Sequence, residues 1–130
     1  MSAETNKELV RKAYSDMNVL LESFSDDATY TFFGKHIFAR TFVGKQDIVE
    51  NLFLRMGQLL SEPIKLDIHT MVAEGDFVVL EATGTAKAKD GEPYNNSYCI
   101  VLELRDAKII RGREYLDTEL VSSLFGHLES

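Results

Sequence analysis

Glu114 has the residue type and the surroundings that proton-transfer chemistry requires. It lies in the segment 108–116, which is typical of a β-strand, and alternation places it on one face with Ile110, Gly112 and Leu116. An ionised carboxylate is costly to bury on such an apolar face, and burial therefore raises its pKa. A carboxyl group that titrates near neutrality is suited to general acid/base catalysis, so we predict that Glu114 transfers protons inside an apolar pocket.

An ion pair is the structural alternative for Glu114. Arg111 and Arg113 are close in the sequence, and a salt bridge to either, or to an arginine of the helices, would make the carboxylate a support of the sheet. The sequence leaves both interpretations open. Gly112 has no side chain and leaves room beside Glu114 for another group to approach.

Further candidate pocket residues lie on the strand before that of Glu114 and among the aromatic residues of the chain. Tyr98 and Asn96 alternate with apolar residues on the same face of segment 94–105 and can supply hydrogen bonds, although Asn96 can equally lie in solvent at the sheet end. Eight Phe and five Tyr provide bulk for a pocket lining. We predict that a ligand contacts five residues: Tyr98, Asn96, Phe33, Phe53 and His36.

Other titratable residues favour structural roles or solvent. Asp117 directly precedes a predicted helix over 118–125, where an N-cap is worth about 1 kcal/mol, although a role as a pocket acid stays open. Cys99 is the single cysteine, and the three histidines do not cluster at metal-binding spacing. With no glycine-rich phosphate loop either, we predict neither a metal nor another cofactor.

The elements that position these residues are two helices followed by a run of strands. Apolar periodicity predicts a helix over 5–24, capped by Thr5 or Asn6, and a second helix of about fifteen residues that begins at Gly44. Between them we expect a strand over 28–33 and a loop over 35–43 that crosses the pocket mouth. Short Gly- and Asp-containing turns then connect four strands into an antiparallel meander: 64–73, 77–89, 94–105 and 108–116.

Length and composition indicate one globular domain over residues 1–130. The apolar fraction is 45% and the charged fraction 27%, which are ordinary for a folded α+β domain. The net charge of −7 argues against nucleic acid as a partner, because phosphate binding needs clustered cations. The polar N-terminus has no apolar run that would serve as a signal peptide or membrane span, so we expect a cytoplasmic protein.

Motifs along most of the chain resemble the nuclear transport factor 2-like superfamily, and within it the SnoaL-like polyketide cyclase and ketosteroid isomerase-like group. They are Asp26-Asp27-Ala28-Thr29, Phe42-Val43-Gly44-Lys45, Tyr94-Asn95-Asn96-Ser97-Tyr98-Cys99, Asp106-Ala107-Lys108-Ile109-Ile110 and Arg113-Glu114-Tyr115-Leu116-Asp117-Thr118. The resemblance implies a curved antiparallel sheet wrapped around N-terminal helices, forming a cone with an apolar pocket. It also implies a homodimer that pairs through the sheet, for which the face with Ile109 and Tyr115 is the candidate.

The chain departs from the catalytic patterns of that superfamily. The strand where steroid isomerases carry their general base holds Tyr30 to Phe33, and their second acid falls near Ile100. The Arg and Asp of the related epoxide hydrolases fall on Gly84 and Ala86. The resemblance retains an acid at Glu114 and places Tyr14 near the oxyanion-stabilising tyrosine of the isomerases, although packing in the core is the alternative for Tyr14.

The sequence therefore predicts a pocket protein that carries out proton transfer without a cofactor. The reaction would be isomerisation, cyclisation or dehydration of a small apolar molecule, with Glu114 and Tyr14 as catalytic residues. Glu114 would transfer the proton, and Tyr14 or Tyr98 would stabilise the developing oxyanion charge. A non-catalytic module for ligand binding or dimerisation is the alternative.

Overall fold

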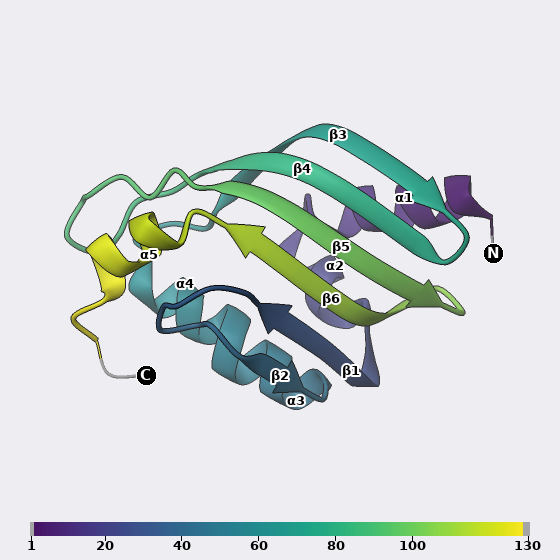
Figure 1. The fold of residues 1–130 in the computed structure, drawn as a ribbon, viewed down its shortest axis with the longest axis horizontal. Helices are drawn as coiled ribbons and strands as arrows, with labels where there is room; N and C mark the ends of the chain where they lie inside the picture. Colours follow the sequence, from purple (N-terminus) through teal and green to yellow (C-terminus); the bar gives the residue numbers. More distant parts are fainter. Residues whose placement is uncertain (1, 129–130) are drawn as a thin grey trace.

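A computed structural model of the chain describes residues 2–128 and contains one six-stranded sheet with helices on one of its faces (Figure 1). The strand order is β2-β1-β6-β5-β4-β3. The strands are β1 (Phe24–Phe32), β2 (Thr41–Val43), β3 (Lys65–Glu74), β4 (Phe77–Thr85), β5 (Ser97–Arg105) and β6 (Lys108–Leu116). The helices are α1 (Ala3–Ala13), α2 (Met17–Glu22), α3 (Lys45–Asp47), the π-helix η1 (Ile48–Leu54), α4 (Arg55–Leu59) and α5 (Thr118–Phe125).

The antiparallel meander from β3 to β6 is confirmed, and β6 has the predicted bounds. β4 and β5 are shorter than expected at the ends that face each other. There the side-chain oxygens of Asn95 and Asn96 accept hydrogen bonds from the backbone N–H groups of Ala86 and Ser97, which local strand pairing would otherwise use. The connection between β4 and β5 therefore leaves the regular ladder.

The predicted first helix is broken at residues 14–16. α1 ends at Ala13, and Asp16 caps the new helix α2 by accepting a hydrogen bond from the Asn18 N–H at 3.0 Å. The N-cap of α1 is Ser2 rather than Thr5 or Asn6. Apolar periodicity continues across the break because both helices bury residues toward the same sheet, so periodicity alone does not reveal it.

The pairing of β1 with β6 is parallel and joins residues distant in the sequence. Tyr30 lies opposite Gly112, and Phe32 lies opposite Glu114. The expected mouth loop contains β2, which pairs antiparallel with the other edge of β1. The inward side chains of β1 therefore lie beside those of β6.

A register shift where β5 meets β6 corrects the expected faces of the two isoleucines. Leu104 pairs with Ile109, while Glu103 pairs with Arg111, so Ile110 is the additional residue of a bulge. Ile109 is consequently buried, with 1% of its surface exposed, and does not belong to the outer sheet face as expected. Gly112 and Glu114, which follow the bulge, do face the core.

The later helices form as expected. Residues 45–59 are helical throughout, with Ile48, Leu52 and Met56 buried, and the middle of this helix is the π-helix η1. α5 has its predicted bounds, and the Asp117 carboxylate caps it by accepting hydrogen bonds from two backbone N–H groups at 3.1 and 3.3 Å. Within residues 2–128, no helix is both long and apolar enough to cross a membrane.

Gly112 gives a test of the β1–β6 contact. A Cβ atom at this position would collide with the Tyr30 ring, so we expect Gly112→Ala to lower the free energy of unfolding by about 1 to 3 kcal/mol in urea titrations. Gly57→Ala is the matched control, because no atom lies within 4 Å of the added methyl group and Ala favours the helix by up to about 1 kcal/mol. Equal stability of wild type and Gly112→Ala would contradict the close packing of Tyr30.

Candidate functional site

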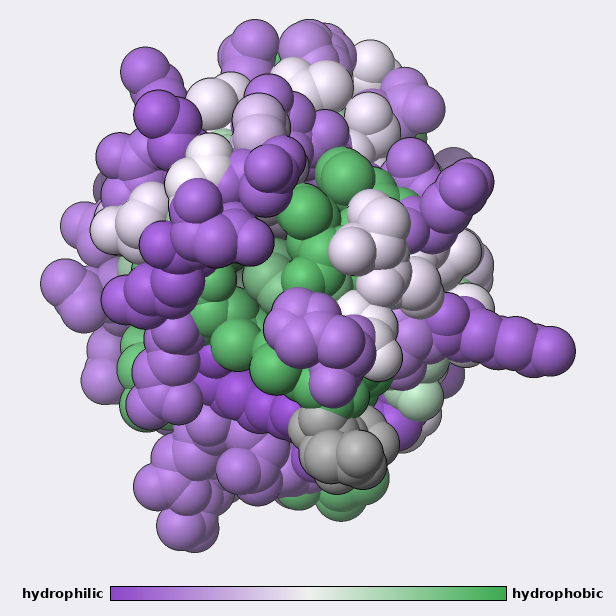
Figure 2. Space-filling view, turned by 90° about the vertical axis from the view of Figure 1, so that its left-hand side faces the viewer, coloured by the Kyte–Doolittle hydropathy of each residue, from purple (hydrophilic) through white to green (hydrophobic). Residues whose placement is uncertain are grey.

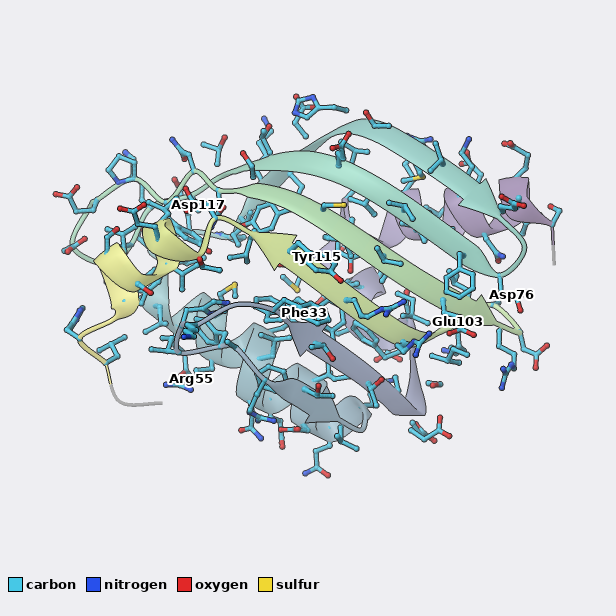
Figure 3. The ribbon with its side chains drawn as sticks, in the orientation of Figure 1. Phe33, Arg55, Asp76, Glu103, Tyr115 and Asp117 are labelled. Carbon is cyan, nitrogen blue, oxygen red and sulfur yellow. The ribbon has the colours of Figure 1, made fainter. Side chains whose placement is uncertain are left out.

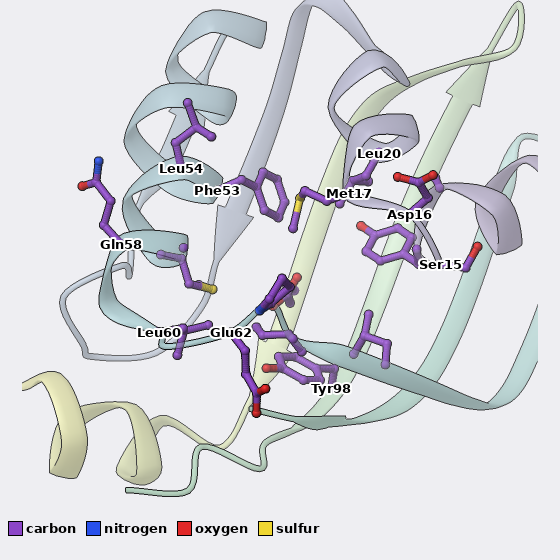
Figure 4. A pocket seen from close by; sticks show the side chains of 18 of the residues that line it. Ser15, Asp16, Met17, Leu20, Phe53, Leu54, Gln58, Leu60, Glu62 and Tyr98 are labelled. Atoms are coloured by element: carbon purple, nitrogen blue, oxygen red, sulfur yellow. The ribbon is translucent and has the colours of Figure 1, made fainter. Parts of the chain in front are cut away.

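A cavity of about 760 Å³ lies between the inner face of the sheet and the helices. Figure 4 shows Phe53 from η1 and Met17 from α2 pointing toward one another, with Tyr98 on the sheet side. The walls of the cavity are mostly apolar and include Leu20, Phe32, Met56, Leu60 and Ile100. The charged residues among its lining, apart from Glu114, are the exposed Asp16, Glu62 and Lys89. The described wall therefore has one buried carboxyl group and no buried cation.

Glu114 lines this cavity from β6 and has only 5% of its surface exposed. The salt bridges of the described residues do not include it, and Arg111 instead pairs with Glu103 at 3.2 Å. Arg113 follows the strand alternation onto the opposite face of the sheet. The ion-pair interpretation of Glu114 is therefore wrong for this structure.

Two tyrosine hydroxyl groups lie beside the carboxyl group of Glu114, where a salt bridge would have needed a cation. The Tyr30 hydroxyl donates a hydrogen bond to Glu114 Oε1 at 2.5 Å, and the Tyr14 hydroxyl lies 3.0 Å from that of Tyr30. Because the single hydroxyl proton of Tyr30 goes to Glu114, Tyr14 is the donor in the second bond. The hydrogen bonds run in one direction, from Tyr14 to Tyr30 to Glu114.

Burial sets the ionisation of these groups. It raises the pKa of Glu114 to about 7, and the hydrogen bond from Tyr30 opposes part of that rise. Burial and the nearby charge of Glu114 raise the pKa of Tyr14 and of Tyr30, so both tyrosines stay neutral at physiological pH. Glu114 is therefore the group in this cluster that changes charge near neutrality, as a general acid or base must.

Tyr98 enters the cavity from β5 and is 7% exposed. Its ring occupies space left by Gly84, where a Cβ atom would lie 2.9 Å from Tyr98 Cε2. The Tyr98 hydroxyl is buried and has no hydrogen-bond partner among the described residues. The Tyr94 hydroxyl acts on the pKa of Tyr98 from nearby, but the two groups do not meet in hydrogen-bonding geometry.

Glu114, Tyr14, Tyr98 and Phe53 are the predicted site residues that line the cavity together. Asn96 does not line it. Its amide joins the start of β5 to the start of α5, because Oδ1 accepts from the Asp117 N–H at 2.9 Å and Nδ2 donates to the Asp117 carbonyl at 3.2 Å. Asp117 itself is the cap of α5, so its carboxylate is used outside the cavity.

Phe33 and His36 also lie outside the cavity lining, contrary to expectation. Phe33 stacks on Tyr115 on the outer sheet face with 4.6 Å between ring centroids, because alternation along β1 turns Phe32 inward instead (Figure 3). The ring of His36 is held by its own loop, where Nδ1 accepts from the Phe38 N–H at 3.1 Å. Partial burial lowers the pKa of His36.

Tyr30 is a residue of the candidate site that local sequence patterns do not identify. Its hydroxyl meets a carboxylate 84 positions later in the chain, and no local pattern identifies that partner. Gly112 is the available signal, since the room it leaves on the strand is filled by the Tyr30 ring. Among residues 2–128, no group of three or more His, Cys, Asp or Glu side chains is arranged to hold a metal ion.

The raised pKa of Glu114 predicts a pH-dependent stability. Its folded pKa lies above the unfolded value, so its stabilising contribution is complete below pH 4.5 and is lost as pH rises through about 7. Relative to Glu114→Gln, which keeps an acceptor for Tyr30, wild type should lose about 2 to 3 kcal/mol of unfolding free energy between pH 5 and pH 8. Urea titrations of both proteins measure this, and parallel pH profiles would contradict a buried titrating carboxyl group.

Comparison with solved structures supports the fold. Bal32a from a soil-derived mobile gene cassette is 27% identical, with a TM-score of 0.83 over 95% of this chain and 98% of that one. A hypothetical protein from Catenulispora acidiphila with a ketosteroid isomerase-like fold, solved with trimethylamine, is 23% identical with a TM-score of 0.74 over 92% of each chain. A putative SnoaL-like polyketide cyclase from Jannaschia sp. CCS1 is 15% identical, with a TM-score of 0.77 over 97% and 94% of the two chains.

Other structures of this fold are described as NTF2-like, which agrees with the fold that the resemblance implies. No curated protein matches the sequence. The family model of the SnoaL-like domain matches residues 11–112, which run from the end of α1 through β5 and stop within β6, two residues before Glu114. The chain belongs to the SnoaL-like domain family.

Proposed function

We propose that the cavity binds a small, mainly apolar molecule and that Glu114 transfers a proton on it without a cofactor. The observation that carries this proposal is a carboxyl group, 5% exposed, at the wall of an apolar cavity with no buried cation beside it. The pKa of this group, raised to about 7, gives comparable amounts of acid and base at neutral pH. Isomerisation, cyclisation and dehydration are the reactions that such a group serves.

The two carboxylate oxygens would have separate tasks. Oε1 is held by Tyr30, which fixes the position of the group and limits its basicity. Oε2, for which the structure shows no hydrogen bond, would accept a carbon-bound proton and return it at another atom of the ligand. Isomerisation then conserves all atoms, and dehydration differs only in that the proton leaves with a hydroxyl group as water.

Ligand binding without chemistry is the second candidate for the same cavity. The solved structure of the Catenulispora acidiphila protein with trimethylamine shows that a protein with this fold is found with a small organic molecule. This alternative predicts binding that does not depend on the protonation of Glu114. Both candidate functions predict that a small molecule binds in the cavity, and only the catalytic one predicts that the molecule is converted to a product.

The outer face of the sheet supports a further proposal, pairing with a second copy of the chain. Phe33 and Tyr115 are 38% and 43% exposed there, and their rings are stacked (Figure 3). Exposed aromatic side chains of this kind are enriched in the cores of protein interfaces. A two-fold dimer would bring the same patch of both copies together.

A carbon-acid probe tests the catalytic proposal. In 5-nitrobenzisoxazole a base removes the C3 proton, the electrons form a nitrile, and the N–O bond breaks to a coloured cyanophenolate. We expect turnover that rises with pH to a half-maximum near 7, because ionised Glu114 is the base. Glu114→Gln should lower the rate by about a hundredfold or more, measured by absorbance.

The matched control is Glu62→Gln, which removes an exposed carboxylate from the cavity rim by the same chemical change. It should keep the wild-type rate and pH profile. Turnover that Glu114→Gln leaves intact would refute Glu114 as the base, and binding of the probe without turnover would favour the binding module.

Sedimentation tests the dimer. At tens of micromolar, wild type should sediment as a dimer, and Tyr115→Glu should sediment as a monomer because a charge would be buried in the apolar contact. Gln46→Glu adds the same charge at an exposed residue of α3 and should leave the dimer intact. A monomeric wild type would contradict the proposal.

A further inference from the structure

The Tyr98 hydroxyl is a buried polar group of the cavity that the protein leaves unpaired. Its side chain is 7% exposed, it lines the cavity, and no described residue accepts its proton. A buried donor without an acceptor costs a folded protein free energy, so such groups normally have a partner in the functional state. The position of Tyr98 indicates that its partner enters through the cavity.

Unlike Tyr98, the tyrosines Tyr14 and Tyr30 have hydroxyl protons that are already used in hydrogen bonds. With Glu114 ionised, Tyr30 gives its proton to the carboxylate and Tyr14 gives its proton to Tyr30. Neither has a second proton to offer to a ligand. Tyr98 is therefore the tyrosine of the described cavity wall with an unused hydroxyl proton.

The charge around Tyr98 restricts the missing partner to a neutral acceptor. Burial and the charge of Glu114 raise the pKa of Tyr98, so the hydroxyl stays protonated and acts as a donor. The same charge disfavours an anionic partner, and the one cation among the lining residues, Lys89, lies exposed at the rim. A carbonyl oxygen is the neutral acceptor that best suits a phenolic donor in an apolar wall.

We propose that the ligand carries a carbonyl-type oxygen that accepts the hydroxyl proton of Tyr98, and that Tyr98, not Tyr14, selects for this group. The inference rests on the cavity of the proposed function and names its ligand class. Ile100 lies opposite Glu114 in the sheet, so Tyr98, two residues before it, is the diagonal neighbour of Glu114. Diagonal neighbours are about 7 to 8 Å apart, so one small molecule can meet both side chains.

A pair of probes that differ in one carbonyl group tests this inference by binding alone. 2-Acetylnaphthalene and 2-ethylnaphthalene have nearly the same shape, and the binding of each is measured by its displacement of one fluorescent apolar dye from the cavity. The two differ in water solubility, so the diagnostic quantity is the ratio of their dissociation constants. Tyr98→Phe should shift this ratio against the ketone by about tenfold, the value of one hydrogen bond.

Tyr14→Phe is the matched control, since it removes a hydroxyl of the same cavity whose proton is already used. It should leave the ratio within about twofold of wild type. The ligand-free Tyr98→Phe protein should be at least as stable as wild type in urea, because it loses an unpaired hydroxyl. That measurement also establishes that the variant is folded.

Each outcome supports or overturns the inference. An unchanged ratio in Tyr98→Phe would mean that solvent satisfies the hydroxyl, and a shifted ratio in Tyr14→Phe would assign the carbonyl to Tyr14. Either result overturns the inference and leaves proton transfer by Glu114 intact. If neither naphthalene binds, the apolar ligand site of the proposed function fails with it, whereas loss of turnover alone leaves this inference standing.

Discussion

The hydrogen bond from Tyr30 to Glu114 is the interaction on which the rest of the site depends. A carboxyl group taken out of water needs compensation, and in this protein a neutral donor provides it rather than a cation. An arginine partner would lower the pKa and keep the group permanently ionised, whereas a tyrosine leaves the pKa near 7. The bond also requires the parallel pairing of β1 with β6 and the space above Gly112. Support of the sheet and a carboxyl pKa near 7 thus come from the same contact.

This contact divides the polar groups of the cavity into two sets. Tyr14, Tyr30 and Glu114 are linked in one directed chain, so the state of the carboxyl group determines which protons remain available. Tyr98 stands apart from that chain with its proton unused. Figure 2 shows apolar residues gathered in a recess at the α5 end of an otherwise mostly hydrophilic surface. An apolar ligand with a single acceptor matches this distribution.

The site also shows how one fold can carry its acid on different strands. The resemblance to steroid isomerases places their base on the strand that here holds Tyr30, and in this chain the acid stands on the neighbouring strand β6. Both strands reach the same cavity, because Phe32 of β1 pairs with Glu114 of β6 and both residues line it. Membership of the SnoaL-like family therefore goes with the fold but leaves the identity and placement of the polar groups in the cavity to the individual sequence.

Local patterns in the sequence determined the meander, the helix over 45–59, the cap at Asp117 and the burial of Glu114, since each depends on residues a few positions apart. Alternation along β6 correctly predicts that Glu114 faces inward. It assigns Ile109 and Ile110 to the wrong faces, because the bulge at Ile110 shifts the alternation before Gly112. Only the tertiary structure decided what meets that group. The pairing of β1 with β6 places Tyr30 within hydrogen-bonding distance of Glu114. Asn96, just before β5, binds the backbone of Asp117 instead of a ligand. Alternation along β1 places Phe33 on the outer face of the sheet. These outcomes depend on contacts between distant segments, for which a single sequence has no periodic signal.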